Sequence, residues 1–257
     1  MSNWLDSHCH LNDEAFDEDI NEVLNLMVEK DVTRCMLVSC NVKDYLKGLK
    51  IHHDKIEIKR AIGVYPEDTN LSEEEYKKFT DYFDEVDAIG EIGLDYHWYK
   101  DTKERQKEIF IKQIEIAKSL NKPIIVHARE AMQDTFDILK MYPCKGVLHC
   151  YSGSAEMAKE FVKLGLYISL AGPITFKNAK EPLEVVKSIP IDHILIETDS
   201  PYMAPVPMRG KRNDPSNVVY IGKLICETLN IEEEEFKKQI NRNYDALFSR
   251  WYNYYVN

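Results

Sequence analysis

The feature of this sequence that most constrains its fold is a regular alternation of short apolar runs with longer stretches of helical period. In the segment 103–120, for example, apolar side chains recur on one face of a helix. Strands separated by helices in this way form parallel β-α-β units. Eight runs are expected as buried strands: Trp4–Asp6, Arg34–Ser39, Ile58–Val64, Ala88–Ile92, Pro123–His127, Gly146–His149, Tyr167–Leu170 and Ile194–Glu197.

The helical stretches complete the pattern, and they are Ala15–Glu29, Ser72–Phe83, Lys103–Leu120, Ala131–Met141, Ser154–Leu164, Pro182–Ser188 and Val218–Leu229, with a last helix over Glu232–Ser249. Eight strands in 257 residues predict an α/β fold, a (β/α)₈ TIM barrel. We expect it to form a single domain over residues 1–257, with the last helix as an addition at the C-terminus. An open doubly wound sheet is the alternative. It requires a glycine-rich loop after the first strand, where this chain has Asp6-Ser7-His8-Cys9-His10.

The composition limits which partners the protein is expected to bind and where in the cell it is expected to lie. The formal net charge is −11, so bulk attraction to nucleic acid is excluded and a polyanionic substrate would need a local positive site. No apolar run reaches the ~20 residues that span a bilayer, and the N-terminus lacks the basic and apolar segments of a signal peptide. The six cysteines contain no C-x-x-C pair and are expected as reduced thiols. A cytoplasmic protein is expected, with no membrane association and no obligate protein partner.

Ionisable side chains gather at the carboxyl ends of the predicted strands. His8 and His10 follow the first strand, where alternate residues point the same way. That pair alone is equally consistent with two rings that pack at a strand end. Four further strands end in such a residue, however: Glu91, His127, His149 and Asp199. In a barrel these ends share one face, which is where barrel enzymes have their active sites.

Six nitrogen and oxygen ligands are too many for one tetrahedral zinc site and suit two divalent ions, Mg²⁺, Mn²⁺ or Zn²⁺. The alternative is that several of them are core polar groups, which would be costly to bury without partners. Strand alternation is expected to point Cys9 and Cys150 away from the site. Three histidines are expected at the surface, His52 and His53 in a polar helical stretch and His193, whereas His97 lies near enough to touch a substrate.

The substrate is less constrained, because two metal ions favour hydrolysis at either phosphorus or a carbonyl carbon. Arg129 follows His127 by two residues, and the loop 205–215 adds Arg209 and Arg212. Arginine side chains hold phosphate oxygens well, but a solvated basic loop explains the same charges equally. Three aromatic residues in the loop after Glu91 are also able to stack a base, namely Tyr96, Trp98 and Tyr99.

Six motifs, in order from residue 6 to about 250, resemble those of the TatD family of metal-dependent deoxyribonucleases. They are Asp6-Ser7-His8-Cys9-His10-Leu11, Gly90-Glu91-Ile92-Gly93-Leu94-Asp95-Tyr96, Val126-His127-Ala128-Arg129-Glu130, His149-Cys150-Tyr151-Ser152-Gly153, Glu197-Thr198-Asp199-Ser200-Pro201-Tyr202-Met203-Ala204-Pro205 and Arg209-Gly210-Lys211-Arg212-Asn213-Asp214-Pro215. One departure lies outside them. The family commonly shows G-x-H-P-H where this chain has Gly63-Val64-Tyr65-Pro66-Glu67.

The resemblance implies an amidohydrolase-type barrel that binds two divalent ions and hydrolyses DNA phosphodiester bonds, with single-stranded DNA cut from the 3′ end. It makes His8, His10 and Asp199 ligands of one ion, His127 and His149 ligands of the other, and Glu91 the bridge. Asp199 is then also the general base. Arg129, Arg209, Arg212 and Tyr65 are the candidate substrate contacts.

Two other functions remain open. The same site suits a metal-dependent hydrolase of a small amide, lactone or phosphoester, although no lysine is placed to bridge the ions as a carbamate. The second is a non-catalytic metal-binding barrel that acts through partners.

Overall fold

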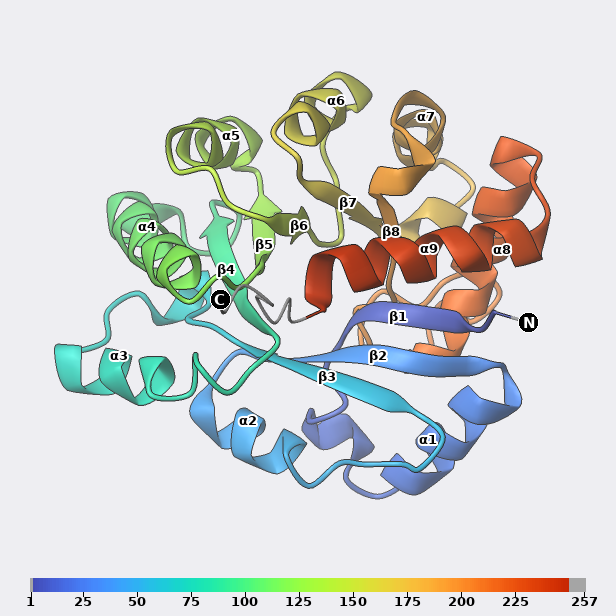
Figure 1. The fold of residues 1–257 in the computed structure, drawn as a ribbon, viewed down its shortest axis with the longest axis horizontal. Helices are drawn as coiled ribbons and strands as arrows, with labels where there is room; N and C mark the ends of the chain where they lie inside the picture. Colours follow the sequence, from blue (N-terminus) through green and yellow to red (C-terminus); the bar gives the residue numbers. More distant parts are fainter. Residues whose placement is uncertain (1, 250–257) are drawn as a thin grey trace, which may run out of the picture.

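The computed structural model describes residues 2–249, which form a barrel of eight parallel strands, as the sequence predicts (Figure 1). The two ends of the predicted domain, residue 1 and residues 250–257, lie outside the described residues. Each strand pairs with the next along the chain. The strands are β1 (Trp4–Cys9), β2 (Val32–Ser39), β3 (Glu57–Ile62), β4 (Ala88–Asp95), β5 (Ile124–Arg129), β6 (Gly146–Leu148), β7 (Tyr167–Leu170) and β8 (Ile194–Ile196).

The barrel closes between β1 and the segment that follows β8. Cys9 and Ser200 form a parallel bridge, and the His10 amide donates to the Ser200 carbonyl at 2.8 Å. The Asp199 amide donates to the His8 carbonyl at 3.0 Å. Because β8 has only three residues, the chain beyond it completes the pairing. These bonds bring Asp199 beside His8 and His10 at the carboxyl end of β1.

Helices surround the strands (Figure 1). They are α1 (Ile20–Glu29), α2 (Val42–Gly48), α3 (Glu73–Thr80), α4 (Lys103–Ser119), α5 (Met132–Met141), α6 (Ala155–Lys163), α7 (Lys180–Ser188), α8 (Val218–Leu229) and α9 (Glu233–Phe248), with short 3₁₀ turns in several loops. The predicted C-terminal helix is therefore present as α9. Among the described residues, no helix is both long enough and apolar enough to cross a bilayer.

The segment between β2 and β3 differs from the prediction. Its helix, α2, begins after Asn41, whose side chain accepts from the Asp44 amide at 2.9 Å and caps the first turn. Seven residues are too few to give a clear helical period, which is why the sequence does not reveal this helix. The prediction of helix at His52 and His53 is wrong, since both lie in the loop beyond α2.

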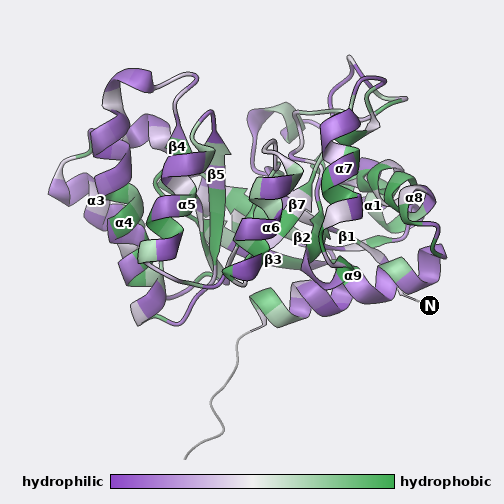
Figure 2. Cartoon of the chain, turned by 90° about the horizontal axis from the view of Figure 1, so that it is seen from above, coloured by the Kyte–Doolittle hydropathy of each residue, from purple (hydrophilic) through white to green (hydrophobic). Residues whose placement is uncertain are grey.

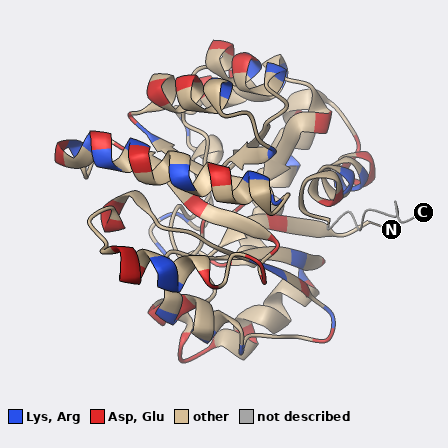
Figure 3. Cartoon of the chain, turned by 60° about the vertical axis from the view of Figure 1, so that its left-hand side comes forward, with Lys and Arg blue, Asp and Glu red and all other residues tan. Residues whose placement is uncertain are grey.

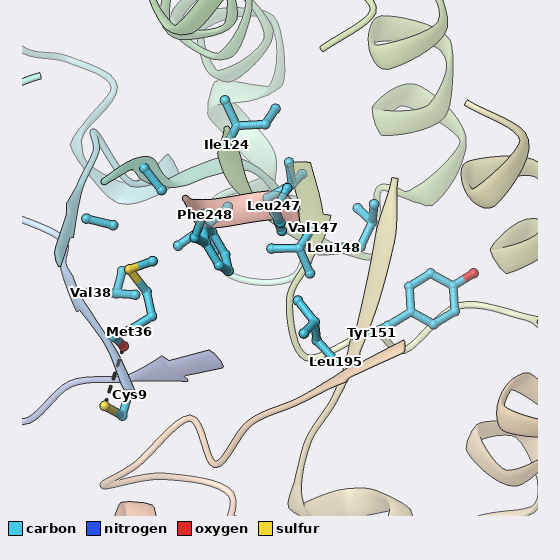
Figure 4. Close-up of a cluster of buried hydrophobic side chains, with 14 of the residues drawn as sticks. Cys9, Met36, Val38, Ile124, Val147, Leu148, Tyr151, Leu195, Leu247 and Phe248 are labelled. Atoms are coloured by element: carbon cyan, nitrogen blue, oxygen red, sulfur yellow. Dashed lines mark hydrogen bonds between the residues drawn. The ribbon is translucent and has the colours of Figure 1, made fainter. Parts of the chain in front are cut away.

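The core consists of the strands and the inner faces of the helices, so apolar residues lie inside and polar residues face outward (Figure 2). Figure 4 shows part of it, in which the Cys9 thiol points to the Met36 carbonyl at 3.4 Å, away from the neighbouring histidines as predicted. Phe248 of α9 packs in the same cluster. Asn243 of α9 donates to the Ile194 carbonyl at 2.8 Å, which places this helix at the amino end of β8. The helix α9 therefore does not cover the opposite face of the barrel, which is formed by the carboxyl ends of the strands.

Candidate metal centre

The six side chains predicted at the strand ends converge at the carboxyl face of the barrel, and Glu91 of β4 lies among them. Its Oε2 atom is 3.3 Å from His8 Nε2. Its Oε1 atom is 2.7 Å from His127 Nδ1 and 2.7 Å from His149 Nε2. The two oxygens of one carboxylate thus face two different sets of imidazoles.

The first set comprises His8 of β1, His10 just after that strand, and Asp199. The Nε2 atoms of the two histidines are 3.2 Å apart, and Asp199 Oδ1 is 3.4 Å from His10 Nε2. His10 Nδ1 lies 3.1 Å from the Val38 carbonyl. Since a carbonyl only accepts, Nδ1 is the protonated nitrogen and Nε2 presents its lone pair to the site.

The second set comprises His127 at the end of β5 and His149 just after β6. Their inward nitrogens, Nδ1 and Nε2 respectively, are 3.1 Å apart. The outward nitrogens face carboxylates, with His149 Nδ1 at 3.2 Å from Glu197 and His127 Nε2 at 3.2 Å from Asp95. A carboxylate that holds the outer proton leaves the inner nitrogen free as a ligand and fixes the ring.

The ionisation of these groups reflects burial together with their neighbours. Burial alone would raise the pKa of Glu91, but the surrounding histidines outweigh it and hold this pKa well below its usual range. Burial would likewise raise the pKa of Asp199, but its neighbours, chiefly His10, outweigh burial and lower this pKa. Burial and the nearby His149 lower the pKa of His8, whereas Glu91 and Glu197 overcome burial and raise the pKa of His149 well above its usual value. The carboxylates are therefore ionised at neutral pH.

These donor atoms fit divalent metal ions. Three groups have ligand atoms that all lie within 4.8 Å of one another, and Glu91 belongs to two of them, one with His8 and His10 and one with His127 and His149. Within the described part of the chain, buried His8 Nδ1 has no hydrogen-bond partner. A shared carboxylate between two sets of imidazoles is an arrangement consistent with a binuclear centre. Nothing in the donor set selects among Mg²⁺, Mn²⁺ and Zn²⁺.

Two carboxylates of the site were not predicted, Asp95 and Glu197. Both are fully buried, and each holds a histidine of the second set. Strand alternation carries the signal for one of them. Asp95 lies four residues after Glu91 in β4, so the argument that paired His8 with His10 applies to Asp95. It does not apply to Glu197, because Glu197 and Asp199 lie beyond β8 and Asp199 has a φ of 54°.

A cavity of about 820 Å³ opens above the six side chains. Trp98, Tyr99 and Tyr202 line it, as does Arg129, whose guanidinium lies 5.5 Å from the centre of the Trp98 ring. Tyr65 also lines it, with its hydroxyl 3.3 Å from His127 Nε2. Burial raises the Tyr65 pKa far above its usual value, so this hydroxyl keeps its proton at neutral pH.

Comparison with known proteins agrees with this site. The family model described as TatD related DNase matches residues 5–249. The chain belongs to the TatD-related DNase family. An uncharacterized metal-dependent hydrolase of Bacillus subtilis, YabD, is 43% identical over 250 residues, which cover 95% of this chain and 98% of that protein. YcfH of Escherichia coli, named in the same way, is 37% identical over 95% of each chain. The chain is accordingly a metal-dependent hydrolase of the TatD family.

Solved structures agree on the fold. The TatD homolog YJJV of Escherichia coli superposes with a TM-score of 0.88 at 26% identity, over 95% of this chain and 97% of that one. An organophosphorus hydrolase variant of Deinococcus radiodurans superposes with a TM-score of 0.67 at 13% identity, over 96% of this chain and 93% of that one. That second likeness concerns the barrel alone.

The two arginines of the loop 205–215, which the TatD motifs suggested as substrate contacts, lie away from the cavity. Arg212 pairs with Asp19 at 2.6 Å on the outside of the barrel, and the Arg209 guanidinium lies 4.4 Å from the centre of the Phe176 ring. Neither lines the cavity. The loop 205–215 therefore brings no arginine to the metal centre, because Asp19 holds the Arg212 guanidinium and the Phe176 ring packs against that of Arg209.

The prediction for Cys150 is wrong, because this residue lines the cavity. Its φ of 42° ends the strand alternation on which that prediction depended. His97 turns away from the cavity, is exposed and lies 2.6 Å from Glu130. His52 is exposed as expected, whereas His193 is half-buried beneath Tyr167.

Proposed function

We propose that this protein is a divalent-metal-dependent deoxyribonuclease that removes nucleotides from the 3′ end of single-stranded DNA. The observation that supports it most strongly is the position of Glu91, whose two oxygens face two sets of imidazoles beneath the cavity. About 820 Å³ lies within the range of small-molecule sites. A space of this size suits the end of a strand rather than its middle. The family match and the aromatic lining point the same way.

The reaction is hydrolysis of a phosphodiester by water. Two divalent ions, when bound, supply an acidified water and polarise the phosphoryl oxygens. Asp199 is ionised, because its neighbours lower its pKa, and it accepts the proton of the attacking water at Oδ1. Arg129 and the neutral Tyr65 hydroxyl lie at the same cavity and donate hydrogen bonds to phosphoryl oxygens.

The test is degradation of a labelled single strand by metal-stripped protein, before and after Mg²⁺, Mn²⁺ or Zn²⁺ is restored. The label is placed at the 3′ end in one substrate and at the 5′ end in another, which separates the two polarities of cutting. His127→Ala is the inactive variant. His193→Ala is its matched control, since His193 precedes β8 at the opposite end of the barrel. We expect metal-dependent loss of the 3′ label in the wild type and in the control but not in His127→Ala. Cleavage that survives in His127→Ala identifies a contaminating nuclease and overturns the proposal.

One observation favours a second candidate, a metal-dependent hydrolase of a small amide, lactone or phosphoester. Among the residues that line the cavity in the described part of the chain, Arg129 is the one lysine or arginine. A small substrate with one negative charge needs no more than one such cation. Metal-dependent turnover of such substrates with no cleavage of any DNA would select this candidate, and metal binding with no turnover at all would select a non-catalytic barrel.

A further inference from the structure

The cavity has an acidic wall, which we define as Asp13, Asp44 and Glu67. These residues follow three consecutive strands, Asp13 in the loop after β1, Asp44 in the first turn of α2 and Glu67 in the short 3₁₀ turn after β3, and all three line the cavity. None is one of the six residues that converge at the strand ends. They therefore carry negative charge that faces the substrate space and is not committed to the metal centre.

Neighbouring donors orient these carboxylates without neutralising them. The Tyr202 hydroxyl donates to Asp13 at 3.1 Å, and the Asn41 amide donates to Asp44 at 2.6 Å. The third carboxylate, Glu67, has the Tyr99 hydroxyl as its neighbour. Burial and Glu67 raise the pKa of Tyr99 to about 12, so this hydroxyl keeps its proton and carries no charge at neutral pH.

No basic side chain from the described residues pairs with the acidic wall. Lys47 is the nearest candidate, but its ammonium bonds to the Asp13 backbone carbonyl at 3.2 Å and pairs with Asp17. Arg212 pairs with Asp19 instead. Outside the metal centre, Arg129 at the end of β5 is the one lysine or arginine of the described residues that lines the cavity. In a closed eight-stranded barrel β5 is opposite β1. The cavity is therefore polarised, with one cation on one side and three anions on the other.

We propose that the acidic wall makes this enzyme select substrates that carry one phosphodiester charge, such as nucleotide esters and the shortest oligonucleotides, over long DNA strands. The inference rests on the proposed function and adds a substrate class to it. One phosphodiester can lie between the metal centre and Arg129. The next phosphates of a longer strand, which lie nearest to the bound one, then come within a Debye length of the acidic wall, which repels them. The net charge of −11 adds to this repulsion.

The test compares three substrates at equal concentration of ends: the p-nitrophenyl ester of thymidine 5′-monophosphate, a thymidine dinucleotide and a long thymidylate strand. For the metal-loaded wild type at low salt we expect kcat/KM to fall by about tenfold from the dinucleotide to the long strand, which release the same kind of leaving group and differ in charge. Added salt screens repulsion, so it should raise kcat/KM for the long strand. A cationic binding surface would give the opposite sign, because its affinity falls with salt.

Glu67→Gln is the decisive variant, because the amide keeps the shape and removes one charge of the acidic wall. The ratio of kcat/KM for the long strand to that for the ester should rise about two- to threefold. Glu115→Gln is the matched control, since it makes the same charge change on the exposed outer face of α4 and should leave the ratio unchanged.

The outcomes separate the two proposals. Equal use of all lengths, or long-strand activity that falls with salt, overturns the acidic-wall inference and leaves the nuclease function standing. Turnover of the ester with cleavage of neither the dinucleotide nor the long strand overturns both proposals, because the dinucleotide carries the same single charge as the ester. Metal-loaded protein that turns over none of the three substrates overturns both.

Discussion

Glu91 is the residue on which the site depends most directly. It is a buried carboxylate with three imidazoles around it, and its neighbours keep it ionised against the cost of burial. Its two oxygens are fixed because β4 holds the backbone and His8, His127 and His149 hold the head group. A residue in this position joins two sets of ligands that come from different strands.

At the same scale, Asp199→Asn tests the proposed general base. The amide keeps the size of the side chain but accepts no proton, so kcat should fall by about 10²–10⁴-fold. Metal content, measured by atomic absorption, should stay close to that of the wild type, because the other five side chains remain. Full activity with both ions bound would show that Asp199 is not the base.

Glu197→Gln tests how the outer carboxylates act. Glu197 accepts from the Cys150 amide at 2.7 Å and lies 3.2 Å from His149 Nδ1, so it orients that ring without being one of the six predicted ligands. We expect apparent metal affinity to fall about 10–100-fold. The measurement is a metal titration, with a thermal melt to show that the variant is folded. Affinity unchanged in a folded variant would contradict the role.

At the scale of elements, the site depends on how firmly each strand is held. The helix α8 packs on β1, the strand that carries His8 and leads into His10. Gly222 of α8 lies directly against the Trp4 ring, where an added Cβ would be 2.2 Å from the nearest ring carbon. Glycine is required here because two elements approach closely.

Gly222→Ala should therefore destabilise the protein by about 1–3 kcal/mol through overpacking, although alanine favours a helix. The measurement is urea unfolding of the metal-free protein. Combined with Trp4→Leu, the same substitution should cost less than it does alone, because the ring is gone. Equal costs in the two backgrounds would exclude the contact with Trp4 as the cause.

At the scale of the whole molecule, charge is distributed unevenly between outside and inside. Acidic and basic side chains both lie along the outer helices, where many form ion pairs with sequence neighbours (Figure 3). Such pairs contribute little individually. The cavity differs, since three carboxylates there have no basic partner among the described residues and a single arginine faces them. Substrate selection by charge is thus a property of the barrel mouth rather than of the general surface.

Metal removal should change the stability of the whole barrel in a pH-dependent way. In the metal-free protein, nearby carboxylates overcome burial and raise the pKa values of three histidines: Asp199 acts chiefly on His10, Asp95 and Glu91 on His127, and Glu91 and Glu197 on His149. A raised pKa adds stability below the unfolded value of about 6.5, and this stability is lost as the pH rises through the folded value. Metal binding must also displace these protons, so its affinity rises with pH.

The gain in Tm on adding Mn²⁺ at one fixed concentration should therefore be larger near pH 8 than near pH 6. Differential scanning calorimetry measures it, with a chelator-treated sample at each pH as the reference. A gain that is the same at both values would contradict proton displacement from the histidines.

Much of this protein was determined by local sequence. Periodicity showed the strands, the major helices and α9, because a chain must repeat every two or about 3.6 residues to bury one face. The same alternation, with the rule that barrel strands share a carboxyl face, brought His8 together with His149 although 141 positions separate them. The helix α2 was missed because it is too short for its period to appear.

Only the tertiary structure decided which other side chains meet the site. Arg209 and Arg212 follow Asp199 closely in the sequence. In the structure, however, their guanidinium groups contact Phe176 and Asp19, respectively. The sequence provided no reason to connect Asp13, Asp44 and Glu67, which come from the separate segments that follow β1, β2 and β3. Long side chains on loops are oriented by whatever partner is nearest in space, and closure of the barrel sets those partners. The ligand set follows from strand period, whereas the charge of the cavity follows from the packing of loops.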